Sequence, residues 1–437
     1  MKKGLLVFST ALVSLSVLTA CNSKETAEPS TASGEVTIQY WHTLTEEDRV
    51  KVLKDMLQTF EAENKGIHVE QVPVPEEDFP NKISAALGAN KLPALIEGGI
   101  DQMLFLGTEG VTDETGHEAL IKEVGQDDFY KGALDTLKDP KQAGYYGVPI
   151  AGWVQGIWYD QKLFKEKGLE PPATWDNILK AAKAFHDPSN QKYGIVIGTA
   201  KEDFTEQTFS QFALSDNALV FGKDGNVKFD TPEMVDSLTY YKNLSQYTPP
   251  GAESWREARE MYLSGRAPMV MYSTYLMGDL SQNPELAKNT GFAIPENKGK
   301  ASFGQITGLT ITNTVSDQQR AAAKKLVAFF MKKENNIKYL HMSPGGSNPV
   351  RKSVTQDPAY LDNDVLKAFG STAKDIPAGL ENLQRFGFQD GVVYPSMGDI
   401  SAQNIIAEAV YDMTEHGKDP AEVAKTAQQK MEKSVKK

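Results

Sequence analysis

The sequence has a single cysteine in 437 residues, Cys21. One thiol excludes an intramolecular disulfide framework, a cysteine-based zinc site and a CxxC redox pair. The six histidines are scattered, and none stands in an HExxH or similar spacing, so we expect no metal site and no cofactor. Clustered positive charge is also missing, because 58 Asp and Glu outnumber 46 Lys and Arg. This balance disfavours binding to nucleic acid or to an anionic membrane surface.

Long apolar runs are missing after the first 20 residues. The start, Met-Lys-Lys, is followed by seventeen uncharged residues, 4–20, which is short of the roughly 20 residues that span a membrane. A basic start, an apolar run and small residues at its end predict a secretory signal peptide over residues 1–20. Residues 21–35 are rich in Ser, Thr, Glu and Ala. They predict a flexible tether, since this composition cannot form a core.

Cys21 stands where the apolar run meets the tether. The segment Leu18-Thr19-Ala20-Cys21 resembles the lipobox of bacterial lipoproteins. The resemblance implies cleavage just before Cys21, a diacylglycerol on its sulfur and fatty acids such as palmitate. A lipid anchor of this kind would hold the protein on the extracellular face of the cytoplasmic membrane, in a bacterium with a single membrane. The alternative is an ordinary secreted protein with an incidental cysteine.

The next part of the chain alternates strand-like and helix-like stretches. Between residues 36 and 99 the order is strand, helix, strand, helix, strand. This order predicts an α/β fold with helices on both faces of a parallel or mixed sheet. In the first helix, one apolar stripe is formed by Val50, Leu53, Leu57 and Phe60, and Thr45 is a candidate N-cap. Ligands bind beyond the carboxyl ends of such strands, so the loops of interest are "YWHTLT", "VPVPEED" and "EGGIDQ".

The remaining residues continue the alternation of strand-like and helix-like segments, and they contain no internal repeat. Further strands are predicted at "YGVPI", "GIWYD", "YGIVIG", "APMVMYST", "TGFAIPE" and "TGLTITN". Helices are predicted at "WDNILKAAKAFH", at "SDQQRAAAKKLVAFFMKK" and over most of the last hundred residues. The length and an apolar content of 40% allow two or three domains.

Five segments follow one another along the chain: "YGVPIAGWVQGIWYDQKLFKEKGL", "PPATWDNILKAAK", "YLSGRAPMVMYSTY", "GLTITNTVSDQQRAAAKKLVAFF" and "GGSNPVRKSV". Together they resemble bacterial extracellular solute-binding proteins of ABC importers, the carbohydrate-binding, maltose-binding-protein-like family 1. The resemblance covers about residues 35–437. It implies an α/β periplasmic-binding-protein-like fold, with two lobes, a ligand cleft between them and a hinge that the chain crosses several times.

The resemblance also implies where the lobes divide. The N-terminal lobe would contain residues 36–150 plus about 290–340, and the C-terminal lobe residues 151–289 plus about 341–437. The chain would cross between the lobes near 149–153, return near 288–305 and leave again near 335–348.

The resemblance implies a monomeric binding protein rather than an enzyme. It would capture a sugar and deliver it to the permease subunits of an ABC transporter. Several aromatic residues in the expected cleft favour an oligosaccharide over a monosaccharide.

Ligand residues are expected where rings can cover the C–H faces of a sugar and where carboxylates or amides can bind its hydroxyl rim. In the first lobe these are Trp41, His42, Asp78 and Asp101. Alternatives stay open: Trp41 packs beneath a helix so that only His42 or Thr43 faces the ligand, Glu77 replaces Asp78, or Asp101 is an ordinary helix N-cap.

Trp153 is the leading candidate, since a large ring between Gly152 and Gly156 at a lobe crossing suits a sugar platform. The other expected contacts are Phe204, Gln207, Trp255, Tyr275 and Gln305. Trp255 faces either the cleft or the core, whereas Trp158 and Trp175 are expected to be structural. Relatives carry an acid in place of Trp153 and a tryptophan in place of Tyr275, so maltose specificity does not carry over.

Two other classes of function stay open. A surface-anchored glycoside-processing enzyme needs two opposed carboxylates, which 58 acidic residues do not exclude. An adhesin-type or peptide-binding lipoprotein is the other alternative. A penicillin-recognising serine enzyme is disfavoured because the sequence has no KTG box.

Overall fold

The computed structural model describes residues 34–139, 141, 144–389 and 392–435. The chain divides into two units, residues 1–35 and residues 36–437, and the fold described below belongs to the second. The expected signal peptide and Cys21 lie outside the described residues. Among the residues that are described, none of the helices combines the length and the apolar character that crossing a membrane requires.

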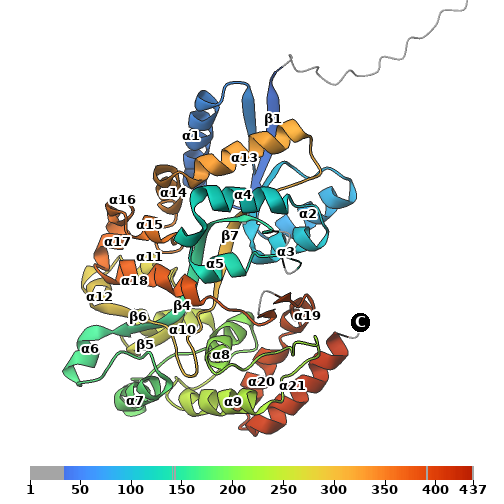
Figure 1. Cartoon of the computed structure of the whole chain (residues 1–437). Helices are drawn as coiled ribbons and strands as arrows, with labels where there is room; N and C mark the ends of the chain where they lie inside the picture. Colours follow the sequence, from blue (N-terminus) through green and yellow to red (C-terminus); the bar gives the residue numbers. More distant parts are fainter. Residues whose placement is uncertain (1–33, 140, 142–143, 390–391, 436–437) are drawn as a thin grey trace, which may run out of the picture. The chain divides into compact units, whose positions relative to one another are not determined.

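The first sheet begins with three parallel strands. These are β1 (Val36–His42), β2 (Ile67–Pro73) and β3 (Leu95–Gly99), with β1 in the middle. Two helices connect them, α1 (Glu47–Glu63) and α2 (Phe79–Gly88). The predicted order of strand, helix, strand, helix, strand is confirmed (Figure 1).

Helix α1 packs on this sheet through its predicted apolar stripe. Leu53, Leu57 and Phe60 are buried, as their spacing on one helix face requires. The prediction of Thr45 as N-cap is wrong, because the backbone of Glu46 is still extended and occupies the cap position itself, without a side-chain capping bond.

One long strand, β4 (Val148–Asp160), joins the two halves of the fold. Residues up to Val154 pair with β7 (Gly304–Ile311), which also pairs with β3 in antiparallel orientation. From Gln155 onward the partners are β5 (Met269–Ser273) and β6 (Thr290–Ala293). The segments "YGVPI" and "GIWYD" therefore belong to a single strand, whose partners change just beyond the expected crossing at 149–153.

The predicted strand "YGIVIG" does not form a regular strand. It meets β5 only through an isolated bridge between Val196 and Val270. Its three apolar residues, Ile195, Val196 and Ile197, are nevertheless fully buried.

The fold has two lobes, one built around the first half of β4 and the other around its second half. In the first lobe, helices pack around β1, β2, β3 and β7; they are α3 (Ile100–Thr108), α4 (Glu114–Val124), α5 (Lys131–Asp135), α13 (Asp317–Met331) and α14 (Lys333–Leu340). In the second lobe a separate apolar core is formed with α7 (Trp175–Phe185), α8 (Asp203–Ser215), α9 (Pro232–Ser245), α20 (Ile405–Thr414) and α21 (Pro420–Ser434). The last two helices return to lie against α8 and α9 (Figure 1).

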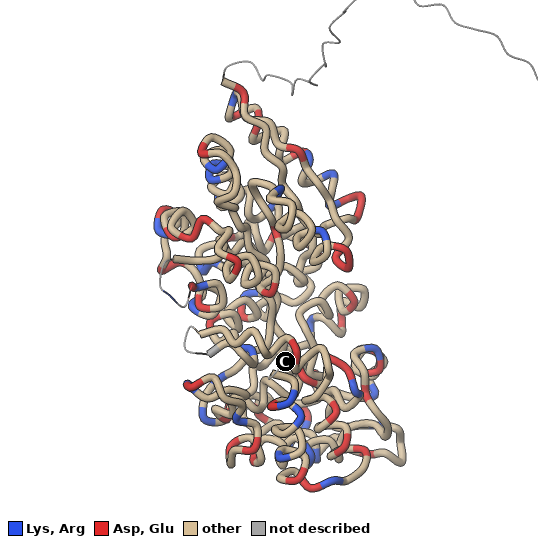
Figure 2. The backbone as a smooth tube through the Cα atoms, turned by 90° about the vertical axis from the view of Figure 1, so that its right-hand side faces the viewer, with Lys and Arg blue, Asp and Glu red and all other residues tan. Residues whose placement is uncertain are grey.

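Shorter elements complete the fold and confirm that the last hundred residues are mainly helical. The helices are α6 (Gln161–Glu166), α10 (Trp255–Leu263), α11 (Leu276–Leu280), α12 (Pro284–Asn289), α15 (Lys352–Thr355), α16 (Pro358–Leu361), α17 (Asp364–Ala368), α18 (Thr372–Asp375) and α19 (Ser396–Ala402). A small two-stranded sheet is formed by β8 (Phe388–Gln389) and β9 (Val392–Val393). Acidic and basic residues are interspersed along the backbone (Figure 2).

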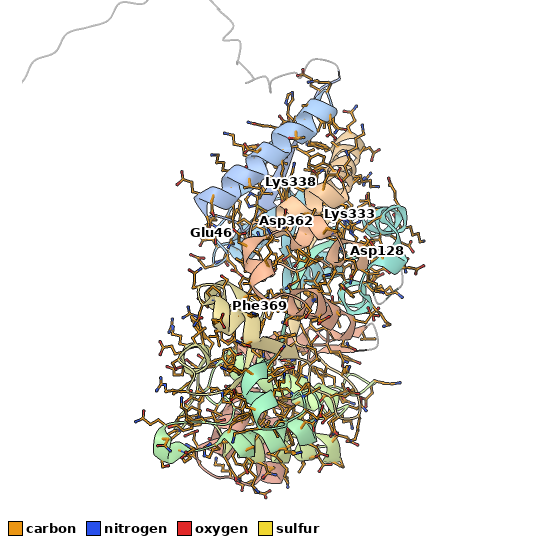
Figure 3. All side chains as sticks on the ribbon, turned by 90° about the vertical axis from the view of Figure 1, so that its left-hand side faces the viewer. Glu46, Asp128, Lys333, Lys338, Asp362 and Phe369 are labelled. Carbon is orange, nitrogen blue, oxygen red and sulfur yellow. The ribbon has the colours of Figure 1, made fainter. Side chains whose placement is uncertain are left out.

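Trp158 and Trp175 are structural, as predicted. Trp158 is fully buried and packs 6.2 Å from the ring of Phe369, which is labelled in Figure 3. The ring of Trp175 stacks on Tyr240 at 4.0 Å, and its Nε1 donates to Ser215 at 3.0 Å.

Candidate functional site

Three aromatic rings meet where β4 changes partners. The ring of Trp153 lies 6.3 Å from that of Tyr275, edge to face, and 5.9 Å from that of Phe303. Tyr275 follows β5 and is 51% exposed, whereas Phe303 precedes β7 and is buried. We call Tyr275, Trp153 and Phe303 the aromatic row. Two of its members were expected from the sequence, and Phe303 was missed.

A polar group, Gln305, lies directly beside the aromatic row. Gln305 pairs with Trp153 across β4 and β7, so both side chains point to the same face of the sheet. Its Oε1 accepts the backbone N–H of Ile100 at 3.2 Å. A Cβ on Gly99 would lie only 2.9 Å from Gln305 Nε2, so a larger residue at this position would displace the amide of Gln305.

Arg385 ties these groups together, although the sequence did not indicate it. The guanidinium donates to Gln305 Oε1 at 3.3 Å and lies 3.5 Å from Asp101 Oδ1. It also lies over the rings of Phe303 and Phe388, 5.3 Å from each centroid. Asp101 is thus both a residue of the first turn of α3 and an ion-pair partner at the site.

A cavity of about 450 Å³ opens beside Arg385. Its walls come from α3, from α8 and from the segment 385–401. The polar lining includes the expected Asp101 and Gln207, and also Asp203, Glu206 and Ser401. The apolar lining includes Phe105, Phe303, Phe386, Phe388 and Met397. Rings with a few polar groups among them are typical of a small-molecule site.

Glu206 is the most perturbed carboxyl of this cavity. Its burial raises its pKa to about 7, against the effects of a hydrogen bond from Ser401 and the charge of Arg385. The Ser401 hydroxyl donates to Glu206 Oε1 at 2.7 Å. The nearby charge of Asp203 raises the pKa further. Neither Glu206 nor Asp203 stood out in the sequence, because acidic residues are common throughout the chain.

A second buried carboxyl, Glu97, lies directly before Gly98 and Gly99. The hydroxyls of Tyr40 and Tyr339 both donate to it, the latter at 2.8 Å. Burial raises the pKa of Glu97 to about 7, although both hydrogen bonds oppose the shift. This network joins β1, β3 and α14, two residues before Gly99, the glycine that lies against Gln305.

Residues of the first lobe also act on Tyr275. Desolvation of its hydroxyl raises the pKa of Tyr275, Arg49 lowers it, and Glu76 and Glu46 raise it. Glu46 lies just before α1 (Figure 3) and forms an ion pair with Arg49 at 3.1 Å. Glu76, in the loop "VPVPEED", therefore acts on Tyr275 through its charge.

Trp41 and His42 lie in the interior. Trp41 packs with Phe79 and Ile83 in an apolar cluster, with the ammonium of Lys82 4.5 Å from its ring. The structure thus favours packing beneath a helix for Trp41. His42 is fully buried, and burial lowers its pKa to about 4, so its imidazole is neutral near pH 7.

Three other expected residues lie outside both the aromatic row and the lining of the cavity. Asp78 is exposed at the N-cap of α2, without a capping bond. Phe204 is buried, with its ring 5.9 Å from Tyr272. Trp255 is 40% exposed at the start of α10.

The structure thus brings together Asp101, Trp153, Gln207, Tyr275 and Gln305. Among the described residues there is no group of three or more His, Cys, Asp or Glu side chains that could hold a metal ion.

Comparison with known proteins gives one consistent result. The family model "Bacterial extracellular solute-binding protein" matches residues 45–337. The putative ABC transporter periplasmic-binding protein YcjN of Escherichia coli (strain K12) is 34% identical over 435 residues, which is 100% of this chain and 99% of that protein. The maltotriose-binding protein of Pyrococcus abyssi is 23% identical, over 80% of this chain and 74% of that protein.

The solved structures agree with this result at the level of the fold. The sugar-binding protein MalE from Xanthomonas citri superposes with a TM-score of 0.76 at 18% identity, covering 92% of this chain and 97% of that chain. At this identity the likeness shows the fold, a two-lobed solute-binding architecture. The family consists of binding proteins of ABC transporters that work outside the cytoplasm. The chain belongs to the bacterial extracellular solute-binding protein family.

Proposed function

We propose that this protein captures an oligosaccharide between its two lobes and delivers it to the permease of an ABC transporter, while a lipid on Cys21 anchors it outside the membrane. The observation that carries the proposal is the aromatic row beside Asp101, Gln305 and Arg385. Aromatic rings next to a carboxylate, an amide and a guanidinium match the faces and the rim of a sugar.

Binding would use both lobes at once. The rings of Trp153 and Tyr275 would cover C–H faces, while Asp101, Gln305 and Gln207 would bind hydroxyls. Asp101 belongs to the first lobe and Gln207 to the second. A ligand that contacts both therefore favours the closed arrangement, and only by its differential affinity for that arrangement.

The choice of a saccharide is supported by the names of several relatives. Besides the maltotriose-binding protein, these include the multiple sugar-binding protein of Streptococcus mutans. The anchor is supported by the sequence Leu18-Thr19-Ala20-Cys21 before a polar tether. Import is supported by the membership of the family, whose proteins serve ABC transporters.

A binding screen tests the proposal. The purified protein should be stabilised against heat by at least one oligosaccharide of a broad panel, because a ligand that binds only the folded state raises its stability. The same sugar should be recovered unchanged after long incubation. Release of reducing sugar would instead support the glycoside-processing enzyme. Stabilisation by peptides alone would support a peptide-binding lipoprotein.

A further inference from the structure

The cavity between α3 and α8 has unbalanced charge. Three carboxylates line it, those of Asp101, Asp203 and Glu206, and Arg385 is the one Lys or Arg among its described lining residues. Arg385 is already paired with Asp101, at 3.5 Å. Within the part of the chain that the structure describes, Asp203 and Glu206 form no ion pair of their own, and the charge of Arg385 acts on Glu206 without offsetting the effect of burial on its pKa.

The direct partners of these two carboxylates are neutral. Gln207 Nε2 donates to Asp203 Oδ2 at 3.3 Å, and Ser401 Oγ donates to Glu206 Oε1 at 2.7 Å. Such bonds occupy lone pairs but do not cancel charge. Glu206 is half-buried, and a partly desolvated carboxylate without a counter-ion is costly. The partner that this pair of residues lacks is a cation.

The walls of the cavity strengthen this preference. Phe303, Phe386 and Met397 are buried, and together with Phe105 they make much of the lining apolar. Apolar walls lower the local dielectric constant around the half-buried Glu206, so charges interact more strongly there than in bulk water, whereas Asp203 stands exposed at the edge of the cavity. A ligand carboxylate would meet two like charges, whereas a neutral sugar would leave both uncompensated.

We propose that the group of the ligand that enters this cavity is a protonated amine, as in an amino sugar, and that Glu206 and Asp203 hold it. This inference rests on the proposed function, because it names the chemical class of saccharide taken by the same site. The amine would donate to the carboxylates, while the aromatic row covers the neighbouring sugar ring.

An array of oligosaccharides in several linkages tests the inference, with each linkage present in neutral, 2-amino and carboxylate-bearing forms. The full-length protein is applied above the pKa of Glu206, which is about 7. We expect the amino form to bind at least about tenfold more tightly than its neutral counterpart, as a hydrogen bond between charged groups allows. If the neutral or carboxylate-bearing form binds as tightly as the amino form, the inference is overturned but the proposed function is not. Binding of no saccharide would overturn the proposed function, and the inference with it.

The variant Glu206→Gln identifies the residue responsible. The amide keeps an oxygen for Ser401 but removes the charge, so the preference for the amine should fall to about twofold or less. Glu123→Gln, an exposed position on α4, is the matched control and should keep the full preference. A full preference retained in Glu206→Gln, or one lost equally in the control, would contradict the assignment.

Discussion

The ring centroids of Trp153 and Tyr275 lie 6.3 Å apart, with the ring planes at 65° to each other. Trp153 lies in the part of β4 that pairs with β7 and is half-buried, whereas Tyr275 follows β5 and is exposed. An edge-to-face pair presents two surfaces in different orientations. A sugar can therefore lie on one ring while the other ring limits its position, which is what a site for a defined saccharide requires.

Arg385 should be sensitive even to a conservative change. Arg385→Lys keeps the charge but loses the planar guanidinium, whose Nη1 lies near both Gln305 and Asp101 and whose plane lies over the rings of Phe303 and Phe388. We expect saccharide affinity to fall about five- to tenfold, since a flexible ammonium holds neither the ring contacts nor the position of Gln305. Titration calorimetry measures the change. Arg320→Lys, in an exposed ion pair with Asp317, is the control and should keep the parent's affinity. If Arg385→Lys also binds the saccharide as tightly as the parent does, Arg385 does not orient the ligand.

Glu206 should make the stability of the protein depend on pH. Burial raises the pKa of Glu206 from 4.5 to about 7, while Asp203 and Arg385 act in opposite directions. Between these two pKa values the folded state binds more protons than the unfolded state, so this contribution to stability falls as pH rises. Glu206→Gln removes the free-energy cost of ionising this carboxyl in the folded state. The variant should therefore be more stable than the parent at about pH 8, by on the order of 1 to 3 kcal/mol.

Urea unfolding at two pH values checks this expectation. The variant and the parent should differ little at about pH 5, where the carboxyl of Glu206 is mostly protonated in the folded state. Glu123→Gln should show no such pH dependence. A variant that is less stable than the parent at both pH values would mean that the charge of Glu206 has a compensating partner.

Tyr339 should contribute to stability through Glu97. Tyr339→Phe removes one of the two hydroxyls that donate to this buried carboxyl. We expect unfolding free energy to fall by about 1 to 3 kcal/mol, the usual cost of an unsatisfied buried polar group. Chemical denaturation measures the loss. Tyr411→Phe, at a half-buried position on α20, should change stability by much less, and equal losses would argue against a special role for the network.

The anchor can be examined at the N-terminus itself. The mature protein should begin at Cys21, with diacylglycerol on the sulfur, because the residues before it resemble a lipobox. Mass spectrometry of the N-terminal peptide measures the added lipid. An unmodified Cys21 still joined to Ala20 would refute the anchor, and Cys21→Ser should release the protein from the membrane.

Local sequence patterns predicted most of the helices and strands of the fold. The apolar stripe at Leu53, Leu57 and Phe60 and the strand-like segments around it appear as predicted, because burial of one face dictates them. The failures were at positions where tertiary context decides. Val196 meets the sheet at a single bridge, and helix α1 begins two residues after Thr45.

The site was only partly predictable for the same reason. Trp153 and Gln305 were indicated because each stands beside glycine at a lobe crossing. The sequence did not indicate Arg385 and Glu206, because their roles depend on contacts with residues far away in the chain, such as Asp101 and Ser401. Trp41 is buried and Trp153 is half-buried, and the sequence left open whether Trp41 faces the ligand or the core, because its burial depends on Phe79 and Ile83 of the next helix.

Titration calorimetry of the protein and of Trp153→Ala, with an oligosaccharide that stabilises the parent, tests the sugar platform directly. We expect saturable binding to the parent and a loss of affinity of tenfold or more in the variant, as truncating a stacking ring costs about 1.4 kcal/mol or more. Phe185→Ala, on α7, controls for loss of an aromatic ring elsewhere. Unchanged affinity in Trp153→Ala would contradict the central claim that the aromatic row is the sugar platform.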